Sequence, residues 1–495
     1  MSGLLPLMIA LPLGAGFILA LTPGKLTKAA DVFALLVPAG LLVMAASLYG
    51  FSGSYYVGGW APPVGITLSI DRFSGILLTG VSLLIFLTAL YSARFMTRYT
   101  SRIKYYVILM MMTAGVNGTL LAGDIFNRFV YVELAAISSY ILAGFGCSGR
   151  ELAAALKFAV LGAAASAVTL LGIAVLYASY GTVDITSLSA AIQAGGGSGV
   201  FFSPLFLAGV LMSAGFALKS ALIPFHIWQP DAMEYSPAPS AALISGAVVT
   251  TTGIYAMVRT LFSVFGVTPQ TGAAVAALGL ISAAAGDLAA SSAGSYRRTA
   301  AYYSISQTGF IIFGFGIGGR LGAEGNLAAA SLVLSGGILH LISSIFFTPL
   351  IFLKAGSAEE LRGTESSAAP SKGISTIGLF SMAGVPPFPG FFSKAMIIAG
   401  CYFSGYYLAA AAAGAVSVRT LVSLLRKRAA LLRPEGKEPA AAIPLLVKLP
   451  VALMALVIIG LSLLAAPRLR GRVLDPAGEG VIEAFLPETG EGAAQ

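Results

Sequence analysis

Two lysines lie beside apolar segments that are interrupted by proline. Lys219 occurs in GFALKSALIPFHIWQPDA, five residues before Pro224, and Lys394 follows the prolines of MAGVPPFPGFFSKAMIIAG. An ammonium group inside a membrane segment costs at least a few kcal/mol, so such a residue usually faces a protein or water-filled interior and serves a function. Broken backbone at membrane depth is tolerated only where protein or water satisfies the freed polar groups. Two such segments in separate parts of one chain are typical of an inverted-repeat ion transporter.

A carboxylate, Glu133, lies in the middle of the apolar stretch FNRFVYVELAAISSYILAGF. At membrane depth it must pair with a cation or take up a proton. A pair between Glu133 and Lys219, on different helices, would be switchable: both groups are charged when paired, and the lysine favours losing its proton when they separate. The alternative is a static structural salt bridge.

Other ionisable residues lie in or near apolar stretches, and each has two interpretations. Lys394 carries protons or extends its ammonium group to the membrane interface. His340, in SGGILHLISSIFF, is a proton relay or a neutral histidine bonded to a helix carbonyl. Lys157 is better explained as reaching the interface, and Asp287 is either an interfacial acid or part of an ion path.

The composition indicates a membrane protein. The chain is 57% hydrophobic and 10% charged, whereas soluble domains carry about 25% charged residues. The net charge of +9 is divided among short loops, which excludes a nucleic-acid partner. Two distant cysteines, Cys147 and Cys401, exclude a disulfide framework, and the histidines lack metal-site spacing. No stretch has the context of a nucleotide-binding loop, so we expect no cofactor, no metal and no catalytic centre.

Apolar stretches long enough to span a bilayer number about 14. They lie near 3–21, 31–50, 72–93, 105–123, 126–146, 153–179, 204–229, 238–262, 273–292, 299–319, 327–353, 375–402, 406–425 and 449–466. We predict a single polytopic domain over 1–466, followed by a polar C-terminal tail over 467–495.

The loops divide into a basic set and a set poor in basic residues. The basic set holds Lys25, Lys28, Arg94, Arg98, Arg102, Lys104, Arg150, Arg297, Arg298, Lys372, Arg426, Lys427, Arg428, Arg433 and Lys437. The other set holds little beyond Arg72, Arg128, Arg320, Arg468, Arg470 and Arg472. Because basic loops stay in the cytoplasm, we predict that both termini face outside.

Several motifs resemble those of a known family. LLAGDIFNRFVYVELAAISSYIL, with Glu133, resembles the fifth-span motif of the antiporter-like membrane subunits of respiratory complex I, Mrp-type cation/proton antiporters and membrane-bound hydrogenases. ALKSALIPFHIWQPDAMEYSPAPSAALISG, RRTAAYYSISQTGF and GVPPFPGFFSKAMII resemble the segments of spans seven and eight, ten, and twelve. The stretch over 55–78 is similar to the Mrp D-type and hydrogenase versions. The resemblance implies an all-α integral membrane fold of about 14 helices, with two inverted five-helix repeats over helices 4–8 (104–262) and 9–13 (273–425) and broken helices 7 and 12.

The chain departs from this family at the centre. The eighth span usually carries a lysine in a pattern like T-K-x-G-x-Y, and here VVTTTGIYAMVR has Thr251 at that position. The eleventh span usually carries a histidine and then a lysine, and here Ser344 and Thr348 take those positions, with His340 one turn earlier and a kink expected at Pro349. Threonine cannot change charge, but it can hold water in a proton chain.

The resemblance implies a proton- or cation-translocating subunit of a multisubunit complex in a prokaryotic cell membrane, with other membrane subunits as partners and protons or Na⁺ as the transported ions. Glu133, Lys219, Thr251, His340, Thr348 and Lys394 are the expected translocation residues. An Mrp-type antiporter and a redox-driven complex like complex I or a hydrogenase are both compatible with the motifs, and any enzyme activity then belongs to partner subunits. A stand-alone secondary transporter and a purely structural subunit are the alternatives.

Overall fold

The computed structural model describes residues 1–62, 64–99, 101–194, 203–362, 372–431 and 444–483. Within these ranges the side chains of 358–362, 372–375, 428–431 and 482–483 are not described. The loop side chains of Lys372 and Arg428, and the whole of Arg433 and Lys437, therefore lie outside the described part of the chain, as does the predicted tail from 484 onward.

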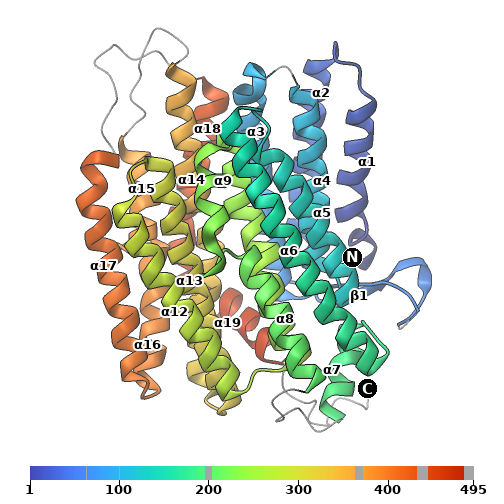
Figure 1. Cartoon of the computed structure of the whole chain (residues 1–495), viewed down its shortest axis with the longest axis vertical. Helices are drawn as coiled ribbons and strands as arrows, with labels where there is room; N and C mark the ends of the chain where they lie inside the picture. Colours follow the sequence, from blue (N-terminus) through green and yellow to red (C-terminus); the bar gives the residue numbers. More distant parts are fainter. Residues whose placement is uncertain (63, 100, 195–202, 363–371, 432–443, 484–495) are drawn as a thin grey trace.

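The described chain is a bundle of long, roughly parallel and antiparallel helices (Figure 1). Within the described residues, ten helices are long and apolar enough to cross a membrane. The prediction of a helical membrane protein is confirmed. One two-stranded antiparallel sheet joins β1 (Gly53–Tyr56) to β2 (Thr67–Ile70), with Gly53 opposite Ile70.

The first part of the chain forms the helices that surround Lys219. These are α1 (Leu7–Leu21), α2 (Thr27–Leu48), α3 (Arg72–Phe95), α4 (Arg102–Leu121), α5 (Ile125–Ala143), α6 (Gly149–Tyr180), α7 (Ile185–Ala194), α8 (Pro204–Lys219), α9 (Trp228–Tyr235), α10 (Ala238–Leu243) and α11 (Ala256–Thr260), with π-helical segments η5 (Ile244–Tyr255) and η6 (Leu261–Phe265). α8 begins at a Ser203 cap followed by Pro204, and it ends at Lys219, where a cation suits the negative end of the helix dipole.

The second part forms the helices around Lys394. These are α12 (Pro269–Ser292), α13 (Tyr296–Ala323), α14 (Leu327–Arg362), α15 (Lys372–Ala383), α16 (Pro389–Phe403), α17 (Tyr407–Leu431), α18 (Leu445–Leu461) and α19 (Pro467–Glu483). The chain breaks between α15 and α16, where Gly384 has φ +75° and Pro389 starts the next helix. Both proline-containing segments are thus interrupted next to their lysine, whereas α14 continues as one helix through Pro349.

Small residues let the helices pack closely, as expected in a membrane. A Cβ added to Gly279 or to Gly309 would meet the backbone of the facing helix at 2.3 Å, so α12 and α13 touch along their main chains. A Cβ on Gly115 would meet the backbone nitrogen of Ala135 at 2.4 Å, which fixes α4 against α5 in the same way. These contacts hold α5 and α12, which carry Glu133 and Asp287, at fixed distances from their neighbours.

The predicted polar tail contains a helix, α19. Leu474, Ala477 and Val481 are buried on one side of it, and Asp475 accepts a hydrogen bond from Ser335 of α14 at 2.6 Å. The residues from 467 to 483 therefore pack against the bundle as an amphipathic element.

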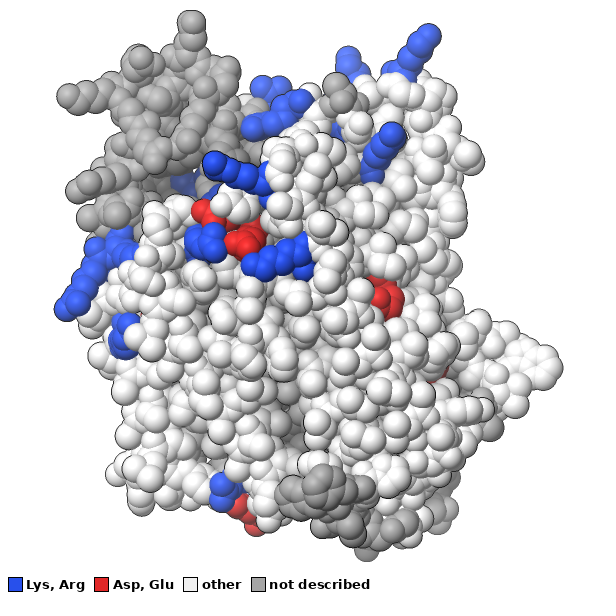
Figure 2. All heavy atoms as spheres, in the orientation of Figure 1, with Lys and Arg blue, Asp and Glu red and all other residues white. Residues whose placement is uncertain are grey.

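The charged residues of the described surface are unevenly distributed. Figure 2 shows Lys and Arg gathered toward one end of the bundle, while the broad middle of this face is almost free of charge. A charge-free belt of this kind matches the surface that lipid tails would cover.

Candidate functional site

Lys219 and Glu133 form an ion pair inside the bundle. The Lys219 Nζ atom lies 2.8 Å from Glu133 Oε1 and donates to it, from α8 to α5. The lysine side chain is 4% exposed and the glutamate side chain 23%. The break after α8 leaves the ammonium group at a helix end, where the backbone turns away and the side chain reaches the neighbouring helix. The predicted pair is present in the structure, while its role in transport stays a prediction.

Ser166 of α6 is a third member of this group. Lys219 Nζ donates to Ser166 Oγ at 3.0 Å, and Ser166 Oγ is also hydrogen-bonded to Glu133 Oε1. The same hydroxyl lies 2.9 Å from the Gly162 carbonyl. Because a hydroxyl has one proton, it can serve either the carboxylate or the helix carbonyl. Ser166 was not predicted, because a serine in an apolar helix carries no sequence signal of its own.

A second ionic group lies on the side of this pair that leads to the basic loops. Lys157 of α6 pairs with Asp231 of α9 at 2.7 Å, and Arg298 of α13 pairs with Asp231 at 2.9 Å and with Glu234 at 2.7 Å. Lys157 therefore has a protein partner in addition to the interfacial position predicted for it. The cluster joins the two parts of the chain at their loop ends.

Three aromatic rings, from α5, α6 and α9, pack against one another near the end of α8. Phe158 stacks on Trp228 with ring centroids 4.0 Å apart, and Tyr140 meets Phe158 edge-on at 4.6 Å. The Trp228 indole donates to the Leu218 carbonyl at 2.9 Å, which fixes the ring next to the end of α8.

Lys394 lies in a second, separate polar group. Its side chain is buried, its Nζ donates to the Met382 carbonyl at the end of α15 at 2.9 Å, and it lies 5.1 Å from the centre of the Phe310 ring. The carbonyl groups freed by the break between α15 and α16 thus bind the ammonium group. Lys394 is held inside the protein and does not extend to the interface.

His340 is buried near Lys394 on α14. Its Nδ1 lies 2.8 Å from Ser393 Oγ and its Nε2 lies 3.2 Å from Gln307 Oε1. Gln307 Oε1 accepts from Nε2, and the Ser393 hydroxyl can donate to Nδ1, so the contacts suit a neutral imidazole. The partners are side chains, not the helix carbonyl that one interpretation expected.

The two central threonines are buried and carry no charge. The Thr251 hydroxyl donates to the Ala247 carbonyl at 2.7 Å within η5, and Thr348 of α14 is 2% exposed. η5 is π-helical over Ile244–Tyr255, a geometry that is rare and often found at functional sites.

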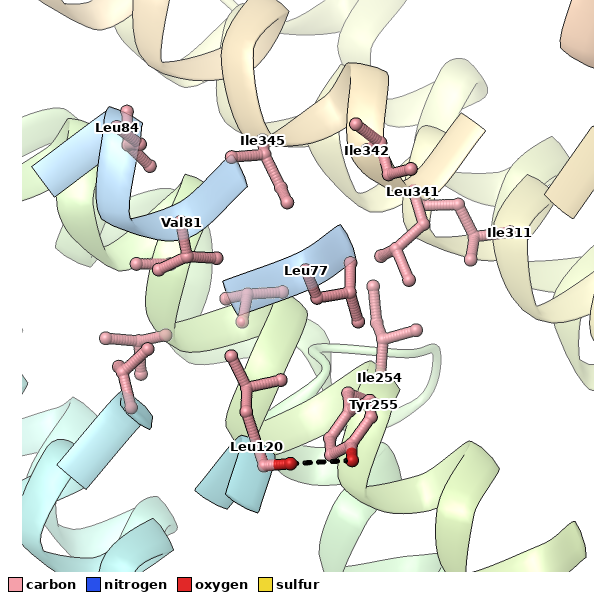
Figure 3. Packing of buried hydrophobic residues seen from close by; sticks show 14 of the residues in the cluster. Leu77, Val81, Leu84, Leu120, Ile254, Tyr255, Ile311, Leu341, Ile342 and Ile345 are labelled. Atoms are coloured by element: carbon pink, nitrogen blue, oxygen red, sulfur yellow. Dashed lines mark hydrogen bonds between the residues drawn. The ribbon is translucent and has the colours of Figure 1, made fainter. Parts of the chain in front are cut away.

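An apolar cluster fills the centre of the bundle. Figure 3 shows side chains of α3, η5, α13 and α14 packed against one another, namely Leu77, Val81, Leu84, Ile254, Ile311, Leu341, Ile342 and Ile345. No hydrogen bond or ion pair among the described residues joins the Glu133–Lys219 pair to His340 or Lys394. The structure therefore groups four of the six predicted residues into two polar sites, Glu133 with Lys219 and His340 with Lys394, while Thr251 and Thr348 belong to neither. Across the described ranges, no cluster of His, Cys, Asp and Glu could hold a metal ion.

The fold and site define a class: a multi-pass membrane protein with buried ionisable side chains at broken helices. Residues 122–420 match the family described as NADH:quinone oxidoreductase/Mrp antiporter, TM. The chain belongs to this family, and the predicted resemblance is confirmed.

Individual relatives agree with this assignment. NADH-quinone oxidoreductase subunit N of Desulforudis audaxviator is 30% identical over 86% of this chain and 82% of its own length. The D-type Na(+)/H(+) antiporter subunit of Alkalihalophilus pseudofirmus is 30% identical over 86% of this chain and 85% of its own. A chain of the Mrp complex from Dietzia sp. DQ12-45-1b has the same fold, with a TM-score of 0.82 at 24% identity over 99% of this chain and 98% of that one.

Proposed function

We propose that this chain is a proton- or cation-translocating membrane subunit of a multisubunit complex. The observation that carries the proposal is the Glu133–Ser166–Lys219 group, in which a buried ammonium at a broken helix pairs with a carboxylate on another helix. Burying such a pair in a membrane is costly, so a pair that is kept there usually serves a function. The two kinds of relative, one from complex I and one from an antiporter, support a subunit role.

Protons reach Lys219 from the side of the basic loops and pass along the membrane plane through water near Thr251 and Thr348. They continue to His340 and leave through Lys394. Separation of Glu133 from Lys219 changes how strongly the lysine holds its proton and so drives the transfer. The two polar sites at the broken helices support the ends of this route.

The kind of complex follows from the partners. In an Mrp-type antiporter the chain exchanges Na⁺ for H⁺ with other membrane subunits, and in a redox-driven complex it pumps protons while partner subunits carry the chemistry. A stand-alone secondary transporter remains the alternative, and the relatives' assignment to complexes weighs against it.

The proposed topology has about 14 membrane helices in one domain over 1–466, with inverted repeats over 104–262 and 273–425. The concentration of basic residues at one end of the bundle supports a cytoplasmic position for that end and both termini outside (Figure 2). The bacterial relatives support a prokaryotic plasma membrane.

The test is purification of the intact complex from native membranes through a tag on this chain, followed by mass spectrometry and transport assays. Small hydrophobic partners indicate an antiporter, and soluble iron–sulfur or nickel–iron proteins indicate a redox pump. A chain that purifies alone contradicts the subunit role. Transport by Lys219→Ala complexes at the wild-type rate contradicts the mechanism.

A further inference from the structure

Two buried arginines that the proposed route does not use lie toward the end of the bundle that carries β1 and β2, called the sheet end below. Arg128 of α5 is 4% exposed and Arg259 of α11 is 8% exposed. Arg128 donates to the carbonyl of Ala122, which forms a bridge with Leu68 of β2. Both guanidinium groups lie over the ring of Tyr255, at 6.0 and 5.5 Å from its centre. One aromatic ring thus contacts two positive charges inside the protein.

The charge of Arg128 is not matched by a carboxylate in contact with it. Its Nη2 atom donates to the Ala122 carbonyl at 2.9 Å. Its Nε and Nη1 atoms are buried and have no hydrogen-bond partner among the described residues. Arg259, by contrast, pairs with Asp71 and donates to Tyr255 Oη at 3.3 Å. A buried guanidinium without a carboxylate partner is costly, so its presence points to a use for the charge itself.

Arg128 lies between the Glu133–Lys219 pair and the sheet end. It precedes Glu133 by five residues in α5, which is about 7.5 Å along the helix axis. η5 packs directly against the end of α8, because a Cβ added to Gly253 would meet the backbone nitrogen of Ser220 at 2.7 Å. The pair and the part of η5 that leads to the arginines are therefore neighbours.

Tyr255 connects the arginines to the centre of the bundle. It follows Thr251 by four residues in η5, and its hydroxyl donates to the Leu120 carbonyl at 3.0 Å (Figure 3). The chain continues from Tyr255 into α11, where Arg259 lies one turn further on. The two guanidinium groups thus flank the stretch of chain that runs from Thr251 toward the sheet end.

Three carboxylates lie at the sheet end beyond the arginines. Asp71, Asp124 and Asp184 each accept a backbone hydrogen bond at the start of a helix, α3, α5 and α7 respectively. Asp124 and Asp184 are joined by a backbone bridge, and the Asp71 side chain is 34% exposed. Because carboxylates near a surface attract protons, this end would supply protons to the Glu133–Lys219 pair unless a positive charge stood between them.

We propose that Arg128 and Arg259 form an electrostatic barrier that closes the sheet end of the Glu133–Lys219 site to protons. The proposal rests on the proposed translocation function. It explains why protons that reach Lys219 from the basic loops continue toward Lys394 and do not cross the membrane directly. A fixed arginine repels protons in membrane pores, and a guanidinium stays charged at every relevant pH. Arg128 suits this role because no contacting carboxylate cancels its charge.

The test is the passive proton leak of the intact complex, reconstituted in lipid vesicles without an energy source. A potassium diffusion potential set with valinomycin drives protons inward, and a pH-sensitive dye inside the vesicles reports their entry. Arg128→Gln removes the charge but keeps an amide donor for the Ala122 carbonyl, and it is expected to raise the leak by on the order of tenfold. Arg128→Lys keeps the charge and is expected to leak no more than the wild type.

Two further variants identify the path of the leak. Combining Arg128→Gln with Lys219→Ala is expected to remove the added leak, because the protons that pass the opened barrier must use Lys219. Arg320→Gln is the matched control: Arg320 also lies over a ring, 4.6 Å from the centre of Tyr406, but it is paired with Glu324 and one third exposed. Its variant is expected to leak at the wild-type rate.

An Arg128→Gln complex that does not leak, alongside a Lys219→Ala complex that has lost coupled transport, overturns the inference and leaves the proposed function intact. A leak that persists in the double variant, or that is equal in Arg128→Gln and Arg128→Lys, assigns Arg128 to a structural role and also overturns the inference. Wild-type coupled transport by Lys219→Ala overturns the proposed function itself. If Arg128→Gln does not assemble, the comparison of Arg259→Gln with Arg259→Lys decides, and equal leaks contradict the barrier.

Discussion

Replacement of Glu133 by glutamine tests the central element of the mechanism. The change removes one negative charge 2.8 Å from Lys219 Nζ and keeps a side chain of the same size that can still accept from Ser166. Two unit charges about 4 Å apart attract by about 4 kcal/mol at the effective dielectric of a protein interior. The partly exposed glutamate side chain reduces this figure, so a loss of about 2 to 4 kcal/mol is the working range.

This energy converts directly into an equilibrium constant. Each 1.36 kcal/mol corresponds to a factor of ten, so the lost attraction corresponds to a factor of roughly 30 to 1,000 in the stability of the closed pair. The loss of the negative charge favours the neutral lysine, and the pH profile of transport therefore moves toward acid. The transport rate should fall by up to the same factor, because the step that depends on the closed pair is lost.

The assay is transport by the intact complex in inside-out membrane vesicles, with a fluorescent dye that reports the pH gradient at a series of pH values. Glu324→Gln is the control, because Glu324 is a partly exposed glutamate paired with Arg320 at the opposite end of the bundle. Equal assembly of all three complexes must be shown by recovery through the tag. A Glu133→Gln profile that superimposes on the wild-type profile would refute the reasoning.

Three further changes test other parts of the structure. Ser166→Ala removes a hydroxyl that is bonded to two charged groups, an interaction worth about 1.5 to 3 kcal/mol. This variant should transport about tenfold more slowly or worse, while Ser166→Thr should keep the wild-type rate. Equal rates in the two variants contradict a role for the hydroxyl. Thr251→Val keeps the side-chain volume and removes the hydroxyl. It should slow transport by roughly tenfold, the equivalent of one lost hydrogen bond, whereas Thr250→Val should leave the rate unchanged. A wild-type rate in Thr251→Val excludes Thr251 from the route. Burial opposes ionisation of Asp71, but Arg259 and Ser74 hold the pKa of its carboxyl below the usual value, so the stabilisation is present at neutral pH and is lost as the pH falls through that lowered pKa. Asp71→Asn should destabilise the protein at neutral pH by about 3 kcal/mol in thermal unfolding, because the buried Arg259 loses its counter-ion, and an unchanged unfolding temperature would show that the pair contributes nothing.

The Glu133–Lys219 pair could be predicted from the sequence because a charge in an apolar stretch is rare and expensive. The breaks were equally visible, since proline both removes an N–H donor and fixes φ. Most of the long helices follow the predicted apolar runs, whereas α7 and α19 were not predicted as helices. In each case a single residue type carries a large energetic penalty, and that penalty is what a sequence reveals.

The partners of those charges could not be predicted, because they depend on which helices lie side by side. Ser166 and Gln307 are common residues in apolar helices, and only the packing of α6 and α13 brings them to Lys219 and His340. Asp287 was open to two interpretations because of its position near a helix end. In the structure its side chain is buried and pairs with Arg419, 132 residues away.

The structure also explains why replacement of the central lysine by Thr251 is tolerable for the fold. A lysine at this position would need a counter-ion, whereas Thr251 is fully buried and needs none. A neutral hydroxyl bonded to its own helix costs little in the same place. The consequence falls on the mechanism: Thr251 cannot change charge, so we expect proton transfer between the two polar sites to require water beside η5. The rate of transport should then depend on how readily water reaches η5, whose π-helical geometry is rare and is often found at functional sites.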